Sequence, residues 1–400
     1  MRIVAISLVA VGLTCASEVP SGTQVQIRLT QAVNTRNAKV GQPVEAVVIA
    51  PVLAGSQIEV AAGVKVAGHV KEVTAAVQPD DQAVLALAFD QMSDSRGVQA
   101  RIEARVASVD NARESIDKDG RILGIIASQS GSARLDQGIN KVSEKYSGLG
   151  ELLGTIKQAV LKDTDANIDF EAGVEMTIEV TKPFVWTGDA RARNVAGVEP
   201  YQELAALVNA ISSRTRALKP PKDSDLTNVM FLGSEQEIGK AFEAAGWSTA
   251  ARLNSMSKFE TFRAMAEDRG YKEAPVSILT LDGRPPDLVF QKQTDTFNAR
   301  HHLRIWHRPE QFQGPDQSED VWVCSATHDT GIAFSEQDRT FIHKVDGNID
   351  RERAKVVNDL LLTGLVRGLA LVDRPDAPAS FYNATGDKLE TDGRMAVIRF

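Results

Sequence analysis

Three things are scarce in this sequence, and each scarcity excludes a class of protein. Only two cysteines occur among the 400 residues, so a fold built on disulfide bonds is excluded. Lysine and arginine (45) are outnumbered by aspartate and glutamate (53), which argues against a nucleic-acid partner. After residue 16, no apolar run approaches the ~20 residues of a membrane-spanning helix. We therefore expect a mature globular chain without a transmembrane helix, stabilised by its hydrophobic cores.

The first residues are typical of an export signal. Arg2 precedes an apolar segment over residues 3–13, and the small residues Thr14, Cys15 and Ala16 follow it. This segment is too short to anchor the chain in a bilayer, so we expect a signal peptide over residues 1–16, cleaved after Ala16. Lipid attachment at Cys15 is the alternative, although Gly12 stands where a lipobox usually has leucine. Either route predicts a location in the periplasm or outer envelope.

Residues 19–110 alternate between apolar and polar side chains. Val25, Ile27 and Leu29 share one face of a strand, and Val44, Ala46 and Val48 share a face of the next. Glycines separate these runs, as in short antiparallel strands joined by tight turns. A barrel or sandwich hides the edges of many short strands. We predict an all-β module over residues 17–185.

Two stretches of this module resemble each other. Residues 19–30 and residues 170–181 each place a glycine turn before an alternating strand. Between them, residues 111–165 lose the alternation, and we expect a helical or mobile insertion there. The order of motifs (Pro20 to Thr23, Gly41, Ala62 to Gly68, Gly173 to Val180) resembles the periplasmic β-barrel domain of TrbI-like type IV secretion proteins. The resemblance implies architecture and carries no function.

A second domain is predicted after a linker. Residues 186–225 lose the strand pattern, and Leu204, Leu207 and Ile211 have helical spacing, which predicts a linker helix over residues 201–218. From residue 226 to residue 400 we expect an α+β domain with a mostly antiparallel sheet. Its predicted helices cover residues 235–245, 256–268 and 350–370, and Ser234 with Glu237 forms a capping box for the first.

Five of the six histidines fall between residues 282 and 353, and strand alternation sorts them. In the predicted strand 301–307, Leu303 and Ile305 require a buried face, which leaves His302, Arg304 and Trp306 on the opposite face. We hypothesise that His302, His328 and His343 converge from neighbouring strands.

Three interpretations of these histidines stay open. Together with Asp287, Asp329 or Asp346, they suit a divalent metal such as zinc, although no tight metal-binding spacing is present. His302, His328, Asp329 and His343 also suit acid–base catalysis. In the third interpretation they are ordinary core or surface histidines. Cys324, in a predicted strand, is interpreted as a small buried residue.

Basic residues near the histidines predict an anion-binding pocket. Arg284 and Asp287 flank a proline pair that stiffens a turn. The turn either directs both side chains into a cleft or is a rigid turn without a ligand. The expected ligand-binding residues are Arg284, Asp287, Gln291, Arg300, Arg304 and Trp306.

Many segments of residues 226–400 together resemble the LssY C-terminal domain. They include residues 231–235, 244–247, 274–277, 283–292, 300–306, 321–329, 343–353 and 392–394. The chain departs from that family's pattern at Ile342, where a histidine is usual, and at His328, where a tyrosine is usual. The resemblance implies domain boundaries and no secure activity.

Two functions follow as hypotheses. The first is an exported envelope protein whose LssY-like domain binds a polar or anionic ligand or an envelope protein, without a required cofactor and with a secretion-associated role. The alternative is a hydrolase, with or without a divalent metal, that acts on a phosphate- or ester-bearing envelope substrate.

Overall fold

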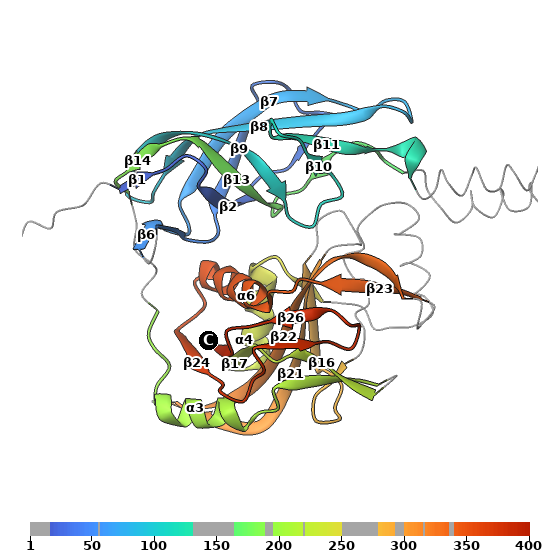
Figure 1. Ribbon diagram of the computed structural model, residues 1–400. Helices are drawn as coiled ribbons and strands as arrows, with labels where there is room; N and C mark the ends of the chain where they lie inside the picture. The colour runs from blue at the N-terminus through green and yellow to red at the C-terminus, as the bar shows by residue number, and fades with distance from the viewer. Residues whose placement is uncertain are drawn as a thin grey trace, which may run out of the picture.

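The chain folds into a β-barrel and an α+β domain that lie against each other, as Figure 1 shows. The computed structural model describes residues 17–54, 57–130, 164–188, 195–218, 221–249, 279–292, 300–314, 317–335 and 340–400. The predicted signal peptide with Cys15, the predicted helix 256–268 and most of the predicted insertion lie outside the described residues. The predicted architecture of two domains, one all-β and one α+β, is confirmed.

Six antiparallel strands close the barrel, because β8 pairs with both β7 and β9. In ring order they are β8 (Gln82–Ser93), β7 (Lys65–Thr74), β4 (Pro43–Val48), β2 (Gln24–Leu29), β13 (Glu175–Lys182) and β9 (Gln99–Val109). The two similar stretches of the sequence supply β2 and β13, which are neighbours in the ring. Closure leaves none of these six strands with an open edge.

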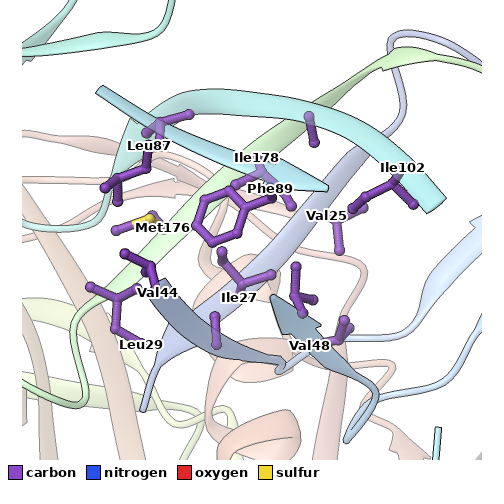
Figure 2. Close-up of a cluster of buried hydrophobic side chains, with 14 of the residues drawn as sticks. Val25, Ile27, Leu29, Val44, Val48, Leu87, Phe89, Ile102, Met176 and Ile178 are labelled. Carbon is purple, nitrogen blue, oxygen red and sulfur yellow. The ribbon is translucent and has the colours of Figure 1, made fainter. Parts of the chain in front are cut away.

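The barrel core follows from the alternation in the sequence. Val25, Ile27 and Leu29 point inward from β2, with polar residues between them, and Phe89 fills the centre. Figure 2 shows these side chains together with inward residues of the neighbouring strands. Burying a side chain of this size contributes ~1.5–3 kcal/mol.

Part of the predicted insertion is barrel structure instead. Residues 115–116 and 121–126 form β10 (Ser115–Ile116) and β11 (Arg121–Ile126), and β11 pairs with β8. A short 3-10 turn, Ala127–Gln129, follows. The prediction of a helical or mobile insertion is wrong for residues 115–126, because β8 is long enough to pair beyond the ring with a further hairpin. Residues 131–163 lie outside the described part.

Three short pairs complete the barrel. They are β1 (Ser17–Val19) with β14 (Phe184–Trp186), β3 (Val33–Asn34) with β12 (Asp169–Phe170), and β5 (Val52–Ala54) with β6 (Gln57–Val60).

The C-terminal domain is built on an eight-stranded sheet in which one described pair is parallel. Its order is β18 (Ser248–Thr249), β20 (Leu288–Lys292), β21 (Arg300–Gln313), β22 (Ser318–Ser335), β17 (Val229–Leu232), β27 (Arg394–Arg399) and β24 (Gly368–Asp373), with β23 (Thr340–Val345) on β22. The mostly antiparallel sheet is thereby confirmed.

Helices cover the sheet. On one side, Phe242 of α4 (Glu235–Ala244) and Val356 of α6 (Ile349–Thr363) join the same core cluster. The predicted capping box of Ser234 and Glu237 is confirmed. The helix predicted to reach residue 370 ends at Thr363, because Gly364 adopts a left-handed conformation (φ 76°) that stops it. On the other side, Leu204 and Val208 of α3 (Tyr201–Ala210) pack in a second cluster.

The predicted linker is largely part of this domain. The expected helix over residues 201–218 ends at Ala210. Beyond it, β15 (Arg214–Leu218) pairs with β16 (Pro221–Leu226) and β19 (Leu279–Thr280) in a three-stranded sheet. A last hairpin joins β25 (Ser380–Tyr382) and β26 (Lys388–Glu390). In β15, buried Thr215 alternates with the more exposed Arg214 and Arg216.

Candidate functional site at the domain junction

The pairing of β21 with β22 decides which histidines meet. His301 lies opposite His328, whereas His302 lies opposite Thr327. Successive residues of a strand point to opposite faces, so His301 and His328 share one face and His302 lies on the other. The predicted convergence of His302 with His328 is therefore wrong.

His301 lies buried between two carboxylates that come from different domains. Its Nδ1 lies 2.7 Å from Glu352 Oε2 on α6, and its Nε2 lies 2.7 Å from Asp110 Oδ2, just after β9 of the barrel. The ring stacks on His328, with centroids 4.2 Å apart and an interplanar angle of 20°. His328 Nε2 in turn lies 2.8 Å from Asn111 Oδ1. We call Asp110, His301, His328 and Glu352 the imidazole cluster.

The two stacked imidazoles have opposite protonation preferences. Burial alone would lower the pKa of His301, but the carboxylates of Glu352 and Asp110 outweigh it and raise that pKa to about 10. Burial and the neighbouring His301 cation both lower the pKa of His328. Burial would raise the pKa of Asp110, but His301 lowers it. The cluster therefore holds one imidazolium between two carboxylates, next to one neutral imidazole.

The same side chains meet the distance requirement for ligands of one metal ion. One donor atom from each of Asp110, His301 and His328 lies within 4.8 Å of the others. Imidazole nitrogens and a carboxylate oxygen are ligands of zinc and of other first-row transition metals.

A second group of buried charges joins the domains beside the imidazole cluster. Glu175 of β13 lies 2.6 Å from Lys292 Nζ on β20, 2.6 Å from Lys355 Nζ on α6 and 2.6 Å from Arg28 Nη2 on β2. Asp359 of α6 lies 2.8 Å from Arg28 and 2.7 Å from Lys355. We call these five residues the lysine–carboxylate cluster.

Two further hydrogen bonds fix this cluster. Trp247 Nε1 donates to Asp359 Oδ2 over 2.9 Å, and Lys292 Nζ donates to Ala245 O over 2.9 Å. The backbone N–H of Asp110 donates to Glu175 O over 2.9 Å. The two clusters are therefore parts of one junction between the barrel and the α+β domain.

The charges of the lysine–carboxylate cluster depend on one another. Burial would raise the pKa of Glu175, but Lys355, Lys292 and Arg28 hold it well below its ordinary 4.5. Burial and the Lys355 cation lower the pKa of Lys292. Burial also opposes the charge of Lys355, yet Asp359 and Glu175 raise its pKa. Three cations surround two carboxylates, so losing either carboxylate leaves buried positive charge without compensation.

The opposite face of β21 carries a buried, ion-paired group. His302 Nε2 lies 2.8 Å from Asp329 Oδ1, and Arg300 Nε donates to Asp329 Oδ2 over 3.2 Å. Arg300 also donates to Gln291 Oε1 over 3.2 Å, and Arg304 Nη1 donates to His302 Nδ1 over 3.2 Å. All five side chains are buried. Burial and the neighbouring Arg304 lower the pKa of His302, against the opposing effect of Asp329. The ring is thereby held neutral, with Nε2–H donating to Asp329.

The predicted basic pocket is wrong for the described residues. Arg300 and Arg304 are buried in the ion-paired group, whereas Arg284 is 53% exposed on its turn. Asp287 accepts a hydrogen bond from the backbone N–H of His307 over 2.8 Å, so it stabilises the turn. Trp306 is buried and its Nε1 donates to Arg284 O over 3.0 Å. The arginines therefore do not line one pocket, because Arg300 and Arg304 lie beneath a covered face of the sheet whereas Arg284 lies on an exposed turn.

His343 lies in β23, where its backbone is opposite Ile332, four residues beyond His328. Its side chain lies outside the described part, so its predicted role as catalytic residue or metal ligand stays a prediction. Cys324 is buried, as predicted.

Sequence reasoning missed most of the junction. His301 was assigned no role, although it stands at the end of the buried face of Leu303 and Ile305, where a histidine is unusual. Asp110 and Glu175 each lie at the end of a barrel strand, and no local pattern distinguishes them from solvated acids. Glu352 lies in the first turn of α6, where the helix dipole alone is enough to account for an acidic residue. The one signal in the sequence was His301, a polar residue on the apolar face of a predicted strand.

Residues 209–395 match the model of a protein family described as LssY C-terminus, which confirms the resemblance of the C-terminal domain. The match begins before residue 226 and so includes β15 and β16. No curated protein matches the chain. Among the helices that the structure describes, none has the length and apolar character needed to cross a bilayer.

Proposed function

We propose that this chain, with its LssY C-terminal domain, is an exported cell-envelope protein in which that domain is a docking module for carboxylate-bearing surfaces. Its partner within the chain is the β-barrel. The module presents Lys292, Lys355 and His301, and the barrel presents Glu175 and Asp110.

One observation carries this proposal. Glu175 projects from the barrel into a buried position where Lys292 and Lys355 each approach one of its oxygens to 2.6 Å. Two lysines that surround one carboxylate select an anionic partner, because each would otherwise be a desolvated and uncompensated charge. An anionic envelope partner would meet the same lysines, with its carboxylate in the place of Glu175.

A double-mutant cycle tests the docking role. Glu175→Gln, Lys355→Met and the double variant are compared with the unmodified chain by urea unfolding. We expect a coupling energy of ~1.5 kcal/mol or more, as close charge pairs across docking interfaces give.

The matched control cycle uses Glu179→Gln and Arg105→Met. This pair also involves β13 and lies 3.3 Å apart, but both side chains are about a third or more exposed. Its coupling energy should stay below ~1 kcal/mol. Equal coupling energies in the two cycles would contradict a docking role for Glu175.

The export part of the proposal has its own measurement. When the full gene product is expressed in a Gram-negative host, the intact mass of the periplasmic protein should correspond to a chain that begins at Ser17. A mass that fits a lipid-modified Cys15 would favour the outer-envelope anchor. A full-length chain retained inside the cell would contradict export.

Hydrolysis of a phosphate- or ester-bearing envelope substrate is the second candidate function. The observation that favours it is the grouping of Asp110, His301 and His328. His302 and Asp329, which the sequence suggested for this chemistry, form a buried ion-paired group with Arg300 on the opposite face. Hydrolysis would therefore have to use the imidazole cluster.

A further inference from the structure

We propose that the imidazole cluster binds one divalent transition-metal ion of the zinc or iron(II) type, with Asp110, His301 and His328 as its protein ligands. The donor atoms of these side chains lie within 4.8 Å of one another. Two imidazoles and one carboxylate suit such ions better than magnesium or calcium, which prefer oxygen ligands alone.

Glu352 supplies an independent observation. Its side chain is 3% exposed, and its Oε1 has no hydrogen-bond partner among the described residues, although Oε2 lies 2.7 Å from His301 Nδ1. A buried carboxylate oxygen without a partner is costly unless positive charge lies nearby. A dication bound at Nε2 of His301 replaces the proton on that nitrogen, which passes to solvent. Positive charge thereby stays beside Glu352, and the bond between Nδ1–H and Glu352 stays in place.

The surroundings of the two histidines match those of known metal ligands. A histidine ligand commonly donates its second ring N–H to a carboxylate or carbonyl oxygen, which fixes the ring and its tautomer. Glu352 does this for His301, and Asn111 Oδ1 orients the His328 ring from 2.8 Å. The exposed pair of His69 and Asp90 on the barrel, 2.9 Å apart, is a useful contrast because both side chains are more than 40% exposed.

Three protein ligands leave at least one position of a four-coordinate ion for water. The side chain of Asp110 is 31% exposed, so the cluster reaches solvent at the domain boundary. An open position is typical of catalytic zinc sites, whereas structural sites are closed by four protein ligands. The site thus fits a water-activating ion better than a purely structural one.

The proposal rests on the docked arrangement, because Asp110 belongs to the barrel whereas both histidines belong to the LssY domain. Docking uses the lysine–carboxylate cluster in addition to the contact of Asp110 with His301, and the ligand variants leave the lysine–carboxylate cluster intact. Small-angle X-ray scattering of every variant therefore distinguishes loss of docking from loss of the metal site. An expanded chain indicates lost docking, whereas a chain of unchanged compactness that no longer binds metal indicates a lost metal site.

The experiment uses the mature chain, treated with EDTA and then titrated with Co²⁺ and with Zn²⁺. We expect one ion per chain, a visible absorption band for the cobalt form and its displacement by zinc. His328→Gln and Asp110→Asn should each weaken zinc binding by more than about 100-fold, and Glu352→Gln by about 10–100-fold. His69→Gln is the control and should bind like the unmodified chain.

Three outcomes would overturn the proposal. One is a compact wild-type chain that binds no ion at all. Another is unaltered affinity in both His328→Gln and Asp110→Asn. The third is loss of binding in His69→Gln, which would assign the ion to the surface pair on the barrel. Circular dichroism of each variant identifies any loss of folding, and the half-buried positions of His328 and Asp110 make both replacements mild.

Discussion

Replacing Glu175 with glutamine is expected to lower the free energy of unfolding by about 3–5 kcal/mol, the range for breaking a buried ion pair on one side. The glutamine keeps the volume of the side chain but removes the charge that faces Lys292, Lys355 and Arg28. Asp359 would then be left as the anion of a cluster with three cations. The barrel and the LssY domain should separate, and calorimetry should resolve two unfolding transitions at lower temperatures.

Glu179→Gln provides the matched control on the same strand. Glu179 is 32% exposed and pairs with Arg105 at the surface, so its loss should change stability by less than ~1 kcal/mol. If both variants unfold alike, the lysine–carboxylate cluster contributes nothing specific to docking.

Acid should act on the unmodified chain in the same way as the Glu175 substitution. The folded pKa of Glu175 lies well below its ordinary 4.5. Its contribution to stability is therefore fully present above pH 4.5 and is lost as the pH falls through the folded value. Glu175→Gln should lack this part of the acid dependence, which urea titrations of both proteins between pH 7 and pH 3 would measure. An identical dependence in the two proteins would contradict the assignment.

Phe242→Ala is expected to destabilise the LssY domain by about 3–5 kcal/mol. The ring is fully buried and stacks on Phe290 at 4.7 Å, with Phe231 at 5.5 Å and Trp247 at 5.7 Å in edge-to-face contact. The alanine leaves a cavity at the centre of this aromatic group, because the surrounding sheet and helices relax only partly into the space that the ring occupied. Urea unfolding followed by circular dichroism measures the loss.

This second variant also separates domain stability from docking. Because Phe242 packs in a core cluster whose members all lie in residues 229–400, the cavity should lower the transition of the LssY domain and leave the barrel transition unchanged. Leu371→Ala, at a position that is 41% exposed in the same domain, should change stability by no more than ~0.5 kcal/mol. A Phe242→Ala loss below ~1 kcal/mol would show that the aromatic group is not the centre of the core.

Local patterns were sufficient for the strands and for one helix start. The alternation of Val25, Ile27 and Leu29 predicted a half-buried strand, and Ser234 with Glu237 predicted a capped helix. These features depend on neighbours within a few residues, so the sequence contains them directly. The prediction of an insertion failed at residues 115–126 because the hairpin there depends on a distant strand: β11 pairs with β8.

The histidines show where local patterns end. Alternation correctly placed His301 and His302 on opposite faces of one strand. It could not tell that the register of β22 sets His328 against His301, since register depends on contacts between strands that the sequence does not order. Alternation also could not show that both faces of the sheet are covered. Arg304 therefore lies in a buried ion-paired group and not in the predicted open pocket.

The sequence by itself determined two domains, an all-β fold followed by an α+β fold, the family of the second domain and the segments rich in histidine. Only the tertiary structure decided the site, because Asp110 and Glu175 come from the barrel and their partners come from the LssY domain. A carboxylate at a strand end has the same local sequence whether it faces water or a lysine 117 residues away. Burial makes such a charge dependent on its partners, and burial is a property of the packed domains.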